Sequence, residues 1–134
     1  MNISHIEHIG IAVNSLEEAI PYYENMLGLK CYAIEEVAEQ KVKTAFFQVG
    51  DTKIELLEST SPDGPVGKFI EKKGPGVHHL AFAVDKVNDS LNELGEKGIR
   101  LIDKTSRKGA EGLNIGFLHP KSTMGVLTEI CGKE

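Results

Sequence analysis

The chain has 134 residues, 40% of them hydrophobic and 26% charged, which is an ordinary composition for one compact globular domain. The net charge of −5 argues against a general nucleic-acid binder, which normally has a basic excess. No apolar run approaches the roughly 20 residues that cross a membrane, and the first residues lack the features of a signal peptide. Cys31 and Cys131 fit no Cys-x-x-Cys pattern. We therefore expect two reduced thiols in a cytoplasmic protein with neither nucleic acid nor membrane as its partner.

The first expected element is a strand with the sequence Glu-His-Ile-Gly-Ile-Ala-Val over residues 7–13. Alternate residues of a strand point to opposite faces, so His8, Gly10 and Ala12 share one face and the bulky aliphatic residues share the other. We expect the bulky face to pack in a core. A histidine among small residues has space around it, which a ligand site needs and a packed core avoids.

A helix should follow this strand. Ser15 and Glu18 have the spacing of a capping box, and apolar residues recur at helical intervals up to Leu27. Gly28 is a stop signal, and Pro21 predicts a kink or a loosened turn inside the helix.

Three strand-like runs come next, followed by a linker. The runs are residues 29–34, 43–49 and 53–58, with a tight turn at Gly50 and Asp51 between the last two. The linker spans residues 60–76 and contains a short helical stretch, 66–72, between proline and glycine breakers.

The second half repeats the first. A strand ending at Val84 places His79, Ala81 and Ala83 on one face, and a helix begins after Asp85 as its cap and ends at Gly98. Three more strands are expected at residues 100–103, 114–118 and 125–130. The sequence predicts a single domain, 1–134, of the α+β class: two βαβββ modules, about 1–60 and 77–134, form one curved mixed sheet. Helices would cover its outside and leave a concave, metal-binding face.

Two carboxylates also repeat, because Glu55 and Glu129 each interrupt an apolar run in the last strand of their module. From His8 to His79 is 71 residues, and from Glu55 to Glu129 is 74. Taken singly, a strand histidine is more often structural and a strand glutamate more often solvated. Because burying a carboxylate is costly unless it is paired or metal-bound, the shared displacement favours four ligands of one divalent cation. Two imidazoles and two carboxylates suit Zn²⁺, Co²⁺, Ni²⁺, Mn²⁺ or Fe²⁺. His5 and His78 are not expected to be ligands, because strand parity places them on the opposite face from the small residues.

These motifs resemble the vicinal oxygen chelate superfamily, which includes glyoxalase I, extradiol dioxygenases and antibiotic-resistance proteins. Within it the chain is most similar to the methylmalonyl-CoA epimerase family, over essentially its whole length. The similarity lies in six short segments: His-Ile-Gly-Ile-Ala-Val at 8–13, Ala-Glu-Gln at 38–40, Lys-Ile-Glu-Leu-Leu at 53–57, Gly-Val-His-His-Leu at 76–80, His-Pro-Lys-Ser at 119–122 and Gly-Val-Leu-Thr-Glu at 125–129.

The resemblance implies an isomerase that interconverts (2R)- and (2S)-methylmalonyl-CoA by abstracting the C2 proton through a metal-stabilised enolate. The family's ligands fall on His8, Glu55, His79 and Glu129, with Co²⁺ as the expected metal and Zn²⁺, Ni²⁺ or Mn²⁺ as alternatives. The family's base falls on Glu39, which would otherwise be interpreted as a solvated loop acid, and we assign Glu129 to the opposite face of the substrate. The family pattern has proline before that base and glycine two residues after it, where this chain has Ala38 and Lys41. The resemblance also implies that the protein is a homodimer.

An acyl-CoA substrate needs further contacts. Lys108 and Gly109, in the loop 107–112, and Lys121 could contact the thioester arm or the phosphates, although that loop could equally be an ordinary hairpin connection. Two other functions remain open: a lactoylglutathione lyase with the same ligands, which would not need Glu39, and a non-catalytic ligand-binding or resistance protein of the same fold.

Overall fold

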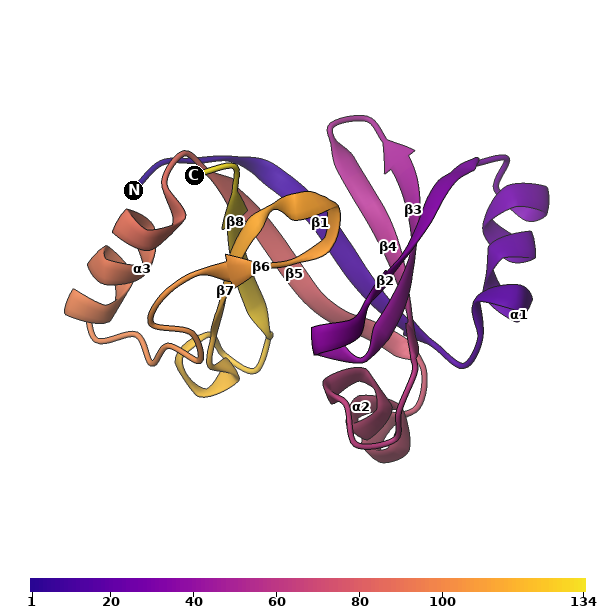
Figure 1. The fold of residues 1–134 in the computed structure, drawn as a ribbon. Coiled ribbons are helices and arrows are strands. Elements are labelled where there is room, and N and C mark those ends of the chain that lie inside the picture. Colours follow the sequence, from indigo (N-terminus) through magenta and orange to yellow (C-terminus); the bar gives the residue numbers. More distant parts are fainter. The chain divides into compact units, whose positions relative to one another are not determined.

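The computed structural model describes residues 1–134. The chain divides into two compact units (Figure 1), called here the first unit, His8–His78, and the second unit, Met1–Glu7 with His79–Glu134. The strands belong to a mixed eight-stranded sheet in the order β2-β3-β4-β1-β5-β8-β7-β6. None of the helices combines the length and the apolar character that crossing a membrane requires.

The first module has the predicted order of strand, helix and three strands. Its elements are β1 (Ile3–Val13), α1 (Leu16–Pro21), a π-helical turn (Tyr22–Met26), β2 (Cys31–Val37), a 3-10 turn (Ala38–Gln40), β3 (Val42–Val49) and β4 (Thr52–Ser59), and α2 (Pro65–Lys73) follows. β1 pairs with β4 in parallel, whereas β2 with β3 and β3 with β4 are antiparallel. The predicted turn at Gly50 is confirmed, with a φ of 62° at that glycine.

The start of α1 is the predicted cap, because the Ser15 hydroxyl accepts a hydrogen bond of 3.1 Å from the Glu18 amide. Pro21 is the last residue of α1, and the chain continues into the π-helical turn, which confirms the predicted disturbance at this proline. Gly28 then takes a left-handed φ of 71° and ends the segment, as predicted.

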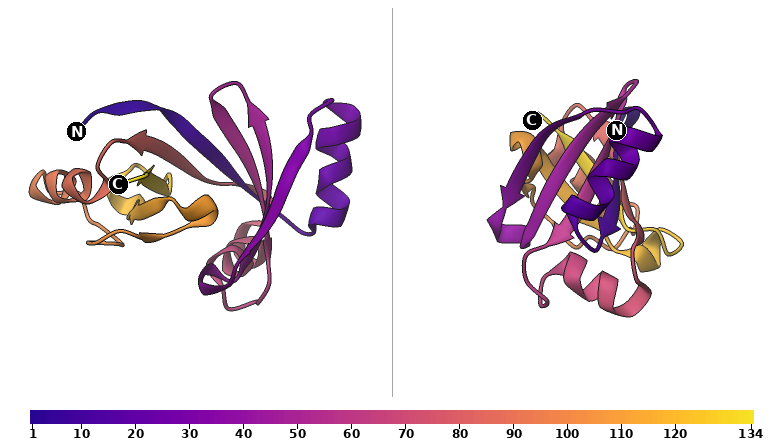
Figure 2. Two further views of the ribbon diagram at one scale, coloured as in Figure 1. Left: turned by 45° about the horizontal axis from the view of Figure 1, so that its top comes forward. Right: turned by 90° about the vertical axis from the view of Figure 1, so that its right-hand side faces the viewer.

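Two helices pack against the sheet of this unit at different places (Figures 1 and 2). α1 covers the face that bears the bulky residues of β1, around a core that includes Leu16, Phe47 and Leu56. α2 covers one end of the opposite face through Val66, which packs with Val42 and other apolar residues. The remainder of that opposite face bears His8 and Glu55.

The second module repeats this order. Its elements are β5 (Gly76–Val84), α3 (Val87–Glu96), β6 (Arg107–Lys108), a 3-10 turn (Ala110–Gly112), β7 (Asn114–Leu118), another 3-10 turn (Pro120–Ser122) and β8 (Thr128–Gly132). β5 and β8 are parallel, and β7 is antiparallel to both β8 and β6. The predicted fold class, with two βαβββ modules and a mixed sheet, is therefore confirmed.

Three details of the second module differ from the prediction. Residues 100–103 form no strand: the amides of Ile102 and Asp103 both donate to the Phe117 carbonyl, which turns the chain, and the two-residue β6 takes the strand's place. β8 begins at Thr128 rather than at residue 125, because the preceding segment contains left-handed residues at Met124 and Gly125. Asp85 is not the cap of α3, since Lys86 occupies that position without a side-chain hydrogen bond.

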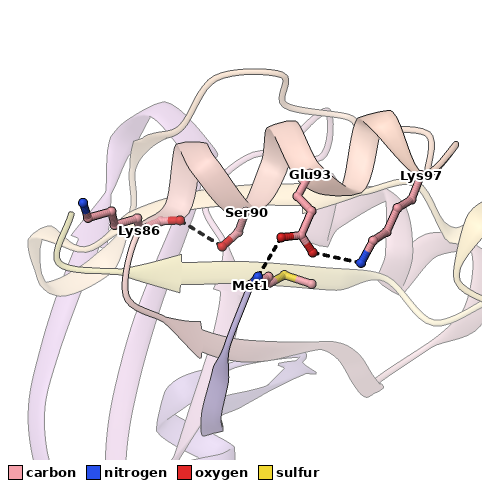
Figure 3. A network of polar contacts seen from close by, with 5 residues as sticks. All are labelled: Met1, Lys86, Ser90, Glu93 and Lys97. Carbon is pink, nitrogen blue, oxygen red and sulfur yellow. Dashed lines mark hydrogen bonds and ion pairs between the residues drawn. The ribbon is translucent and has the colours of Figure 1, made fainter.

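α3 is held to its unit by both apolar and polar contacts. Its buried face includes Leu91, which lies so close to β7 that a Cβ on Gly116 would come within 2.6 Å of the leucine side chain. On its other side, Glu93 contacts the Met1 nitrogen at 2.6 Å and the Lys97 ammonium at 2.9 Å (Figure 3). The helix ends before Gly98, which has a φ of 91°, as predicted.

Candidate metal and substrate site

In the first unit, His8 and Glu55 form a buried pair. Glu55 on β4 lies opposite Gly10 on the parallel strand β1, and His8 comes two residues before Gly10 on the same face. The His8 Nδ1 atom lies 3.2 Å from the Glu55 Oε2 atom, and the two residues are only 4% and 5% exposed. The parallel register therefore brings together two residues that the sequence predicted as ligands.

In the second unit, His79 and Glu129 form a pair with the same strand relationship. Glu129 on β8 lies opposite Ala81 on the parallel strand β5, and His79 comes two residues before Ala81. The His79 Nε2 atom lies 3.4 Å from the Glu129 Oε1 atom, and both residues are buried. The predicted repeat thus extends to the pairing of the strands.

Each glutamate also has a phenylalanine opposite it on its other neighbouring strand, which sequence reasoning missed. Phe46 on β3 lies opposite Glu55, and Phe117 on β7 lies opposite Glu129. The Phe117 ring meets the His79 ring edge to face at 5.6 Å between centroids. From Phe46 to Phe117 is 71 residues, the same displacement as between the two histidines, and this spacing could have identified them.

The predicted base, Glu39, lies in the 3-10 turn Ala38–Gln40 of the first unit. Its side chain is exposed, and its carboxylate has no hydrogen-bond or ion-pair partner within the chain. Lys41 ends the turn with a left-handed φ of 54°, a conformation that glycine adopts more easily.

Lys41 anchors this turn to the segment before α2. The Lys41 carbonyl accepts a hydrogen bond of 2.9 Å from the Thr60 amide, and its ammonium donates one of 2.8 Å to Asp63. Hydrogen bonds from Lys41 and then from Ser61 lower the pKa of Asp63 to about 2. The turn thus has a fixed main chain and a free carboxylate.

The predicted substrate-binding residues lie in two turns of the second unit. The Gly109 amide donates to the Leu113 carbonyl at 2.9 Å, and a Cβ on Gly109 would come within 2.9 Å of Ile115. Lys108 donates to the Gly112 carbonyl at 3.2 Å. Lys121 lies exposed in the 3-10 turn Pro120–Ser122. Contacts of these three residues with a substrate remain a prediction.

Comparison with known proteins gives the family. The Glyoxalase/Bleomycin resistance protein/Dioxygenase superfamily matches residues 7–117, which is most of the chain. The chain belongs to this superfamily. The predicted resemblance to it is confirmed.

Individual members of the superfamily are similar over almost the whole chain. The uncharacterized protein YqjC of Bacillus subtilis is 46% identical over 129 residues, covering 96% of this chain and 92% of YqjC. The human mitochondrial methylmalonyl-CoA epimerase is 37% identical over 130 residues, covering 96% of this chain and 74% of that protein. A solved structure of a Streptomyces coelicolor methylmalonyl-CoA epimerase variant in complex with 2-nitronate-propionyl-CoA superposes with a TM-score of 0.95 at 36% identity, covering 98% and 95% of the two chains. The predicted similarity to these epimerases is confirmed, and so is the predicted enzyme class, an isomerase.

The donor atoms fit the metal that the superfamily resemblance implies. Each His–Glu pair supplies one imidazole nitrogen and one carboxylate oxygen from buried residues, which is the mixed nitrogen and oxygen donor set that first-row divalent ions prefer. Binding of one ion by all four residues is a proposal, taken up below.

The two other strand histidines have different surroundings. His5 is exposed, and its Nδ1 atom shares a hydrogen bond of 2.8 Å with the Ser4 hydroxyl. His78 packs edge to face on Phe69 at 5.0 Å between ring centroids, and burial lowers the pKa of His78 to about 4. The contrast between these residues and the buried pairs agrees with the parity argument from the sequence.

Proposed function

We propose that this protein is a methylmalonyl-CoA epimerase, which inverts the C2 centre of its substrate by removing and returning a proton. The observation that supports the proposal is the buried His–Glu pair that occurs once in each module, in a chain whose relatives include named methylmalonyl-CoA epimerases. A relative that binds 2-nitronate-propionyl-CoA supports an acyl-CoA as the substrate.

We further propose that His8, Glu55, His79 and Glu129 hold one divalent cation, Co²⁺ being the expected ion and Zn²⁺, Ni²⁺ or Mn²⁺ the alternatives. When bound, such a cation supplies Lewis-acid stabilisation of the negative charge that develops on the thioester oxygen, which is worth several kcal/mol. The two imidazoles and two carboxylates would hold the cation at a fixed position. Because these four side chains are buried, they would also exclude water from the cation.

The proposed proton acceptors are two glutamates. Glu39 has a carboxylate that no donor in the chain binds, so it can accept a proton from C2, and its turn is fixed by Lys41. Inversion requires a second group on the other side of the reacting carbon, and we assign that role to Glu129. Its neighbour His79 would help to keep the Glu129 carboxylate oriented.

Proton exchange at C2 tests the epimerase proposal. The metal-loaded protein is incubated with methylmalonyl-CoA in D₂O, and deuterium at C2 is followed by NMR and mass spectrometry. We expect deuterium uptake and loss of optical purity. Absence of both, with turnover of the hemithioacetal of methylglyoxal and glutathione instead, would establish the lyase function. Binding without turnover of either compound would establish a non-catalytic function.

A matched pair of variants tests Glu39. Glu39→Gln should lose deuterium exchange and keep its metal, whereas Glu36→Gln, which removes an exposed acid from the neighbouring strand, should keep both. Exchange at the wild-type rate in Glu39→Gln would place the base elsewhere.

A further inference from the structure

Arg107 shares a sheet face with the His79–Glu129 pair. Arg107 on β6 lies opposite Ile115 on β7, Phe117 comes two residues after Ile115, and Phe117 lies opposite Glu129 on β8. Residues directly opposite each other in antiparallel strands, and residues two apart along a strand, point to the same side of a sheet. The side chains of Arg107 and Glu129 therefore emerge from the same face.

Strand alternation places Arg107 and the adjacent Lys108 on opposite faces of the sheet. Lys108 follows Arg107 directly in β6, so its side chain emerges from the opposite face, where its ammonium donates to the Gly112 carbonyl at 3.2 Å. Of the two cations that β6 contributes, Arg107 is the one that faces the candidate site of its unit.

Phe117 joins the guanidinium to the histidine. The Arg107 Cζ atom lies 5.7 Å from the centroid of the Phe117 ring, and the His79 imidazole also lies against that ring, at 5.6 Å between centroids. A cation over an aromatic ring is attracted by the ring's negative face, so the phenylalanine helps to fix the guanidinium. The positive charge therefore lies one aromatic ring away from a proposed metal ligand.

Asp103 also fixes the guanidinium, through the Nε atom of Arg107. The Arg107 Nε atom donates to Asp103 Oδ1 at 3.0 Å, while Asp103 Oδ2 accepts the Phe117 amide at 2.9 Å. The Asp103 amide in turn donates to the Phe117 carbonyl at 3.2 Å, so the carboxylate is held by the strand itself. The bond to Nε leaves the two terminal NH₂ groups of Arg107 for other acceptors, and its side chain is 39% exposed.

Such a group is suited to bind an anionic oxygen ligand. A guanidinium is always charged near neutrality and presents a rigid pair of donors that matches a carboxylate or a phosphate. Because Asp103 and Phe117 already hold it, little side-chain entropy is lost when a ligand binds. We infer that Arg107 is a specificity-determining residue that binds the free carboxylate of the malonyl-type acyl group, an inference that rests on the proposed function.

The test compares malonyl-CoA with propionyl-CoA, which has a methyl group where malonyl-CoA has its free carboxylate. Binding of malonyl-CoA and propionyl-CoA to the metal-loaded protein is measured by isothermal titration calorimetry for wild type, Arg107→Gln, Arg107→Lys and the matched control Lys104→Gln, which removes an exposed positive charge three residues earlier in the chain. We expect Arg107→Gln to weaken malonyl-CoA binding by about tenfold to 100-fold, the range for a lost charge-assisted contact, and to leave propionyl-CoA unchanged. Arg107→Lys should restore part of the difference, and Lys104→Gln should match wild type.

The other outcomes overturn the inference in distinguishable ways. Equal weakening of both esters would assign Arg107 to the CoA phosphates, and the corresponding pantetheine thioesters, which lack the nucleotide, would then bind wild type and Arg107→Gln alike. Unchanged binding of both esters with a lower Tm would leave Arg107 only its structural contact with Asp103. If wild type bound neither ester, the proposed function itself would be wrong.

Discussion

Metal-dependent stabilisation should distinguish the two proposed ligand histidines from an ordinary histidine of the same strand. We predict that His8→Gln and His79→Gln each lose the stabilisation that a divalent cation gives to the wild-type protein. His5→Gln is the matched control, because His5 also lies in β1 but is exposed, and its ring shares a hydrogen bond with the neighbouring Ser4 hydroxyl. Glutamine keeps a polar side chain of similar length and removes the imidazole donor.

The expected magnitude follows from linkage. The ligands of each pair are far apart in the sequence, so the unfolded chain offers no preformed site and the cation binds only the folded state. At 100 times its dissociation constant, a ligand of this kind stabilises the folded state by about 2.7 kcal/mol. For a domain of this size about 4 °C of Tm corresponds to 1 kcal/mol, so removal of the metal should lower Tm by about 10 °C.

The assay is differential scanning calorimetry with and without a chelator, combined with metal analysis of the purified proteins. Wild type and His5→Gln should contain one ion per chain and show the full shift in Tm, whereas His8→Gln and His79→Gln should show almost none. A full shift in either variant would refute the ligand assignment. Two ions per chain, with one lost in each variant, would show that the two His–Glu pairs bind separate metals.

Three further predictions concern stability. Gly116→Ala should lower the free energy of unfolding by about 1–3 kcal/mol, measured by urea denaturation, because the new methyl group overlaps the buried Leu91 side chain; an unchanged value would mean that the helix can shift freely. Ser15→Ala should cost about 1 kcal/mol through loss of the helix cap, and an equal Tm for variant and wild type would contradict this. The pKa of Asp63 is lowered to about 2, so its pairing with Lys41 stabilises the folded state fully at pH values above the ordinary carboxyl pKa. This stabilisation is lost as the pH falls toward about 2. Asp63→Asn should flatten the dependence of Tm on pH in this acid range, and a dependence equal to that of wild type would contradict the assignment.

The His–Glu pairs were predictable because they depend on strand parity and on a repeat, both of which are visible in the sequence. Parity places His8 and Gly10 on one face whatever the neighbouring strand does. The repeat then adds the equivalent residues of the second half. The pairing of the strands supplied the remaining step, because only the parallel register brings Glu55 within 3.2 Å of His8.

The second module was harder to predict where its elements are short or its residues unusual. β6 has only the two cationic residues Arg107 and Lys108, which give no alternation of polar and apolar positions. The more apolar residues near 101 favoured a strand that the structure does not form, since two consecutive amides bond to one carbonyl of β7. The role of Asp103 could not be seen either, because its partners lie 4 and 14 residues away across a turn.

The internal repeat duplicates the proposed metal ligands but not Glu39 or Arg107. A cation needs similar ligands from each module, and His8 and His79 are duplicated together with their glutamates. Methylmalonyl-CoA is asymmetric, with a carboxylate on one side of C2 and a long thioester on the other, so residues that recognise it need not be duplicated. Position 110, which lies 71 residues after Glu39, is an alanine, and β2 contains no arginine that could correspond to Arg107. The duplicated residues thus suit the proposed metal, and the two unduplicated ones suit the proposed chemistry and recognition of the substrate.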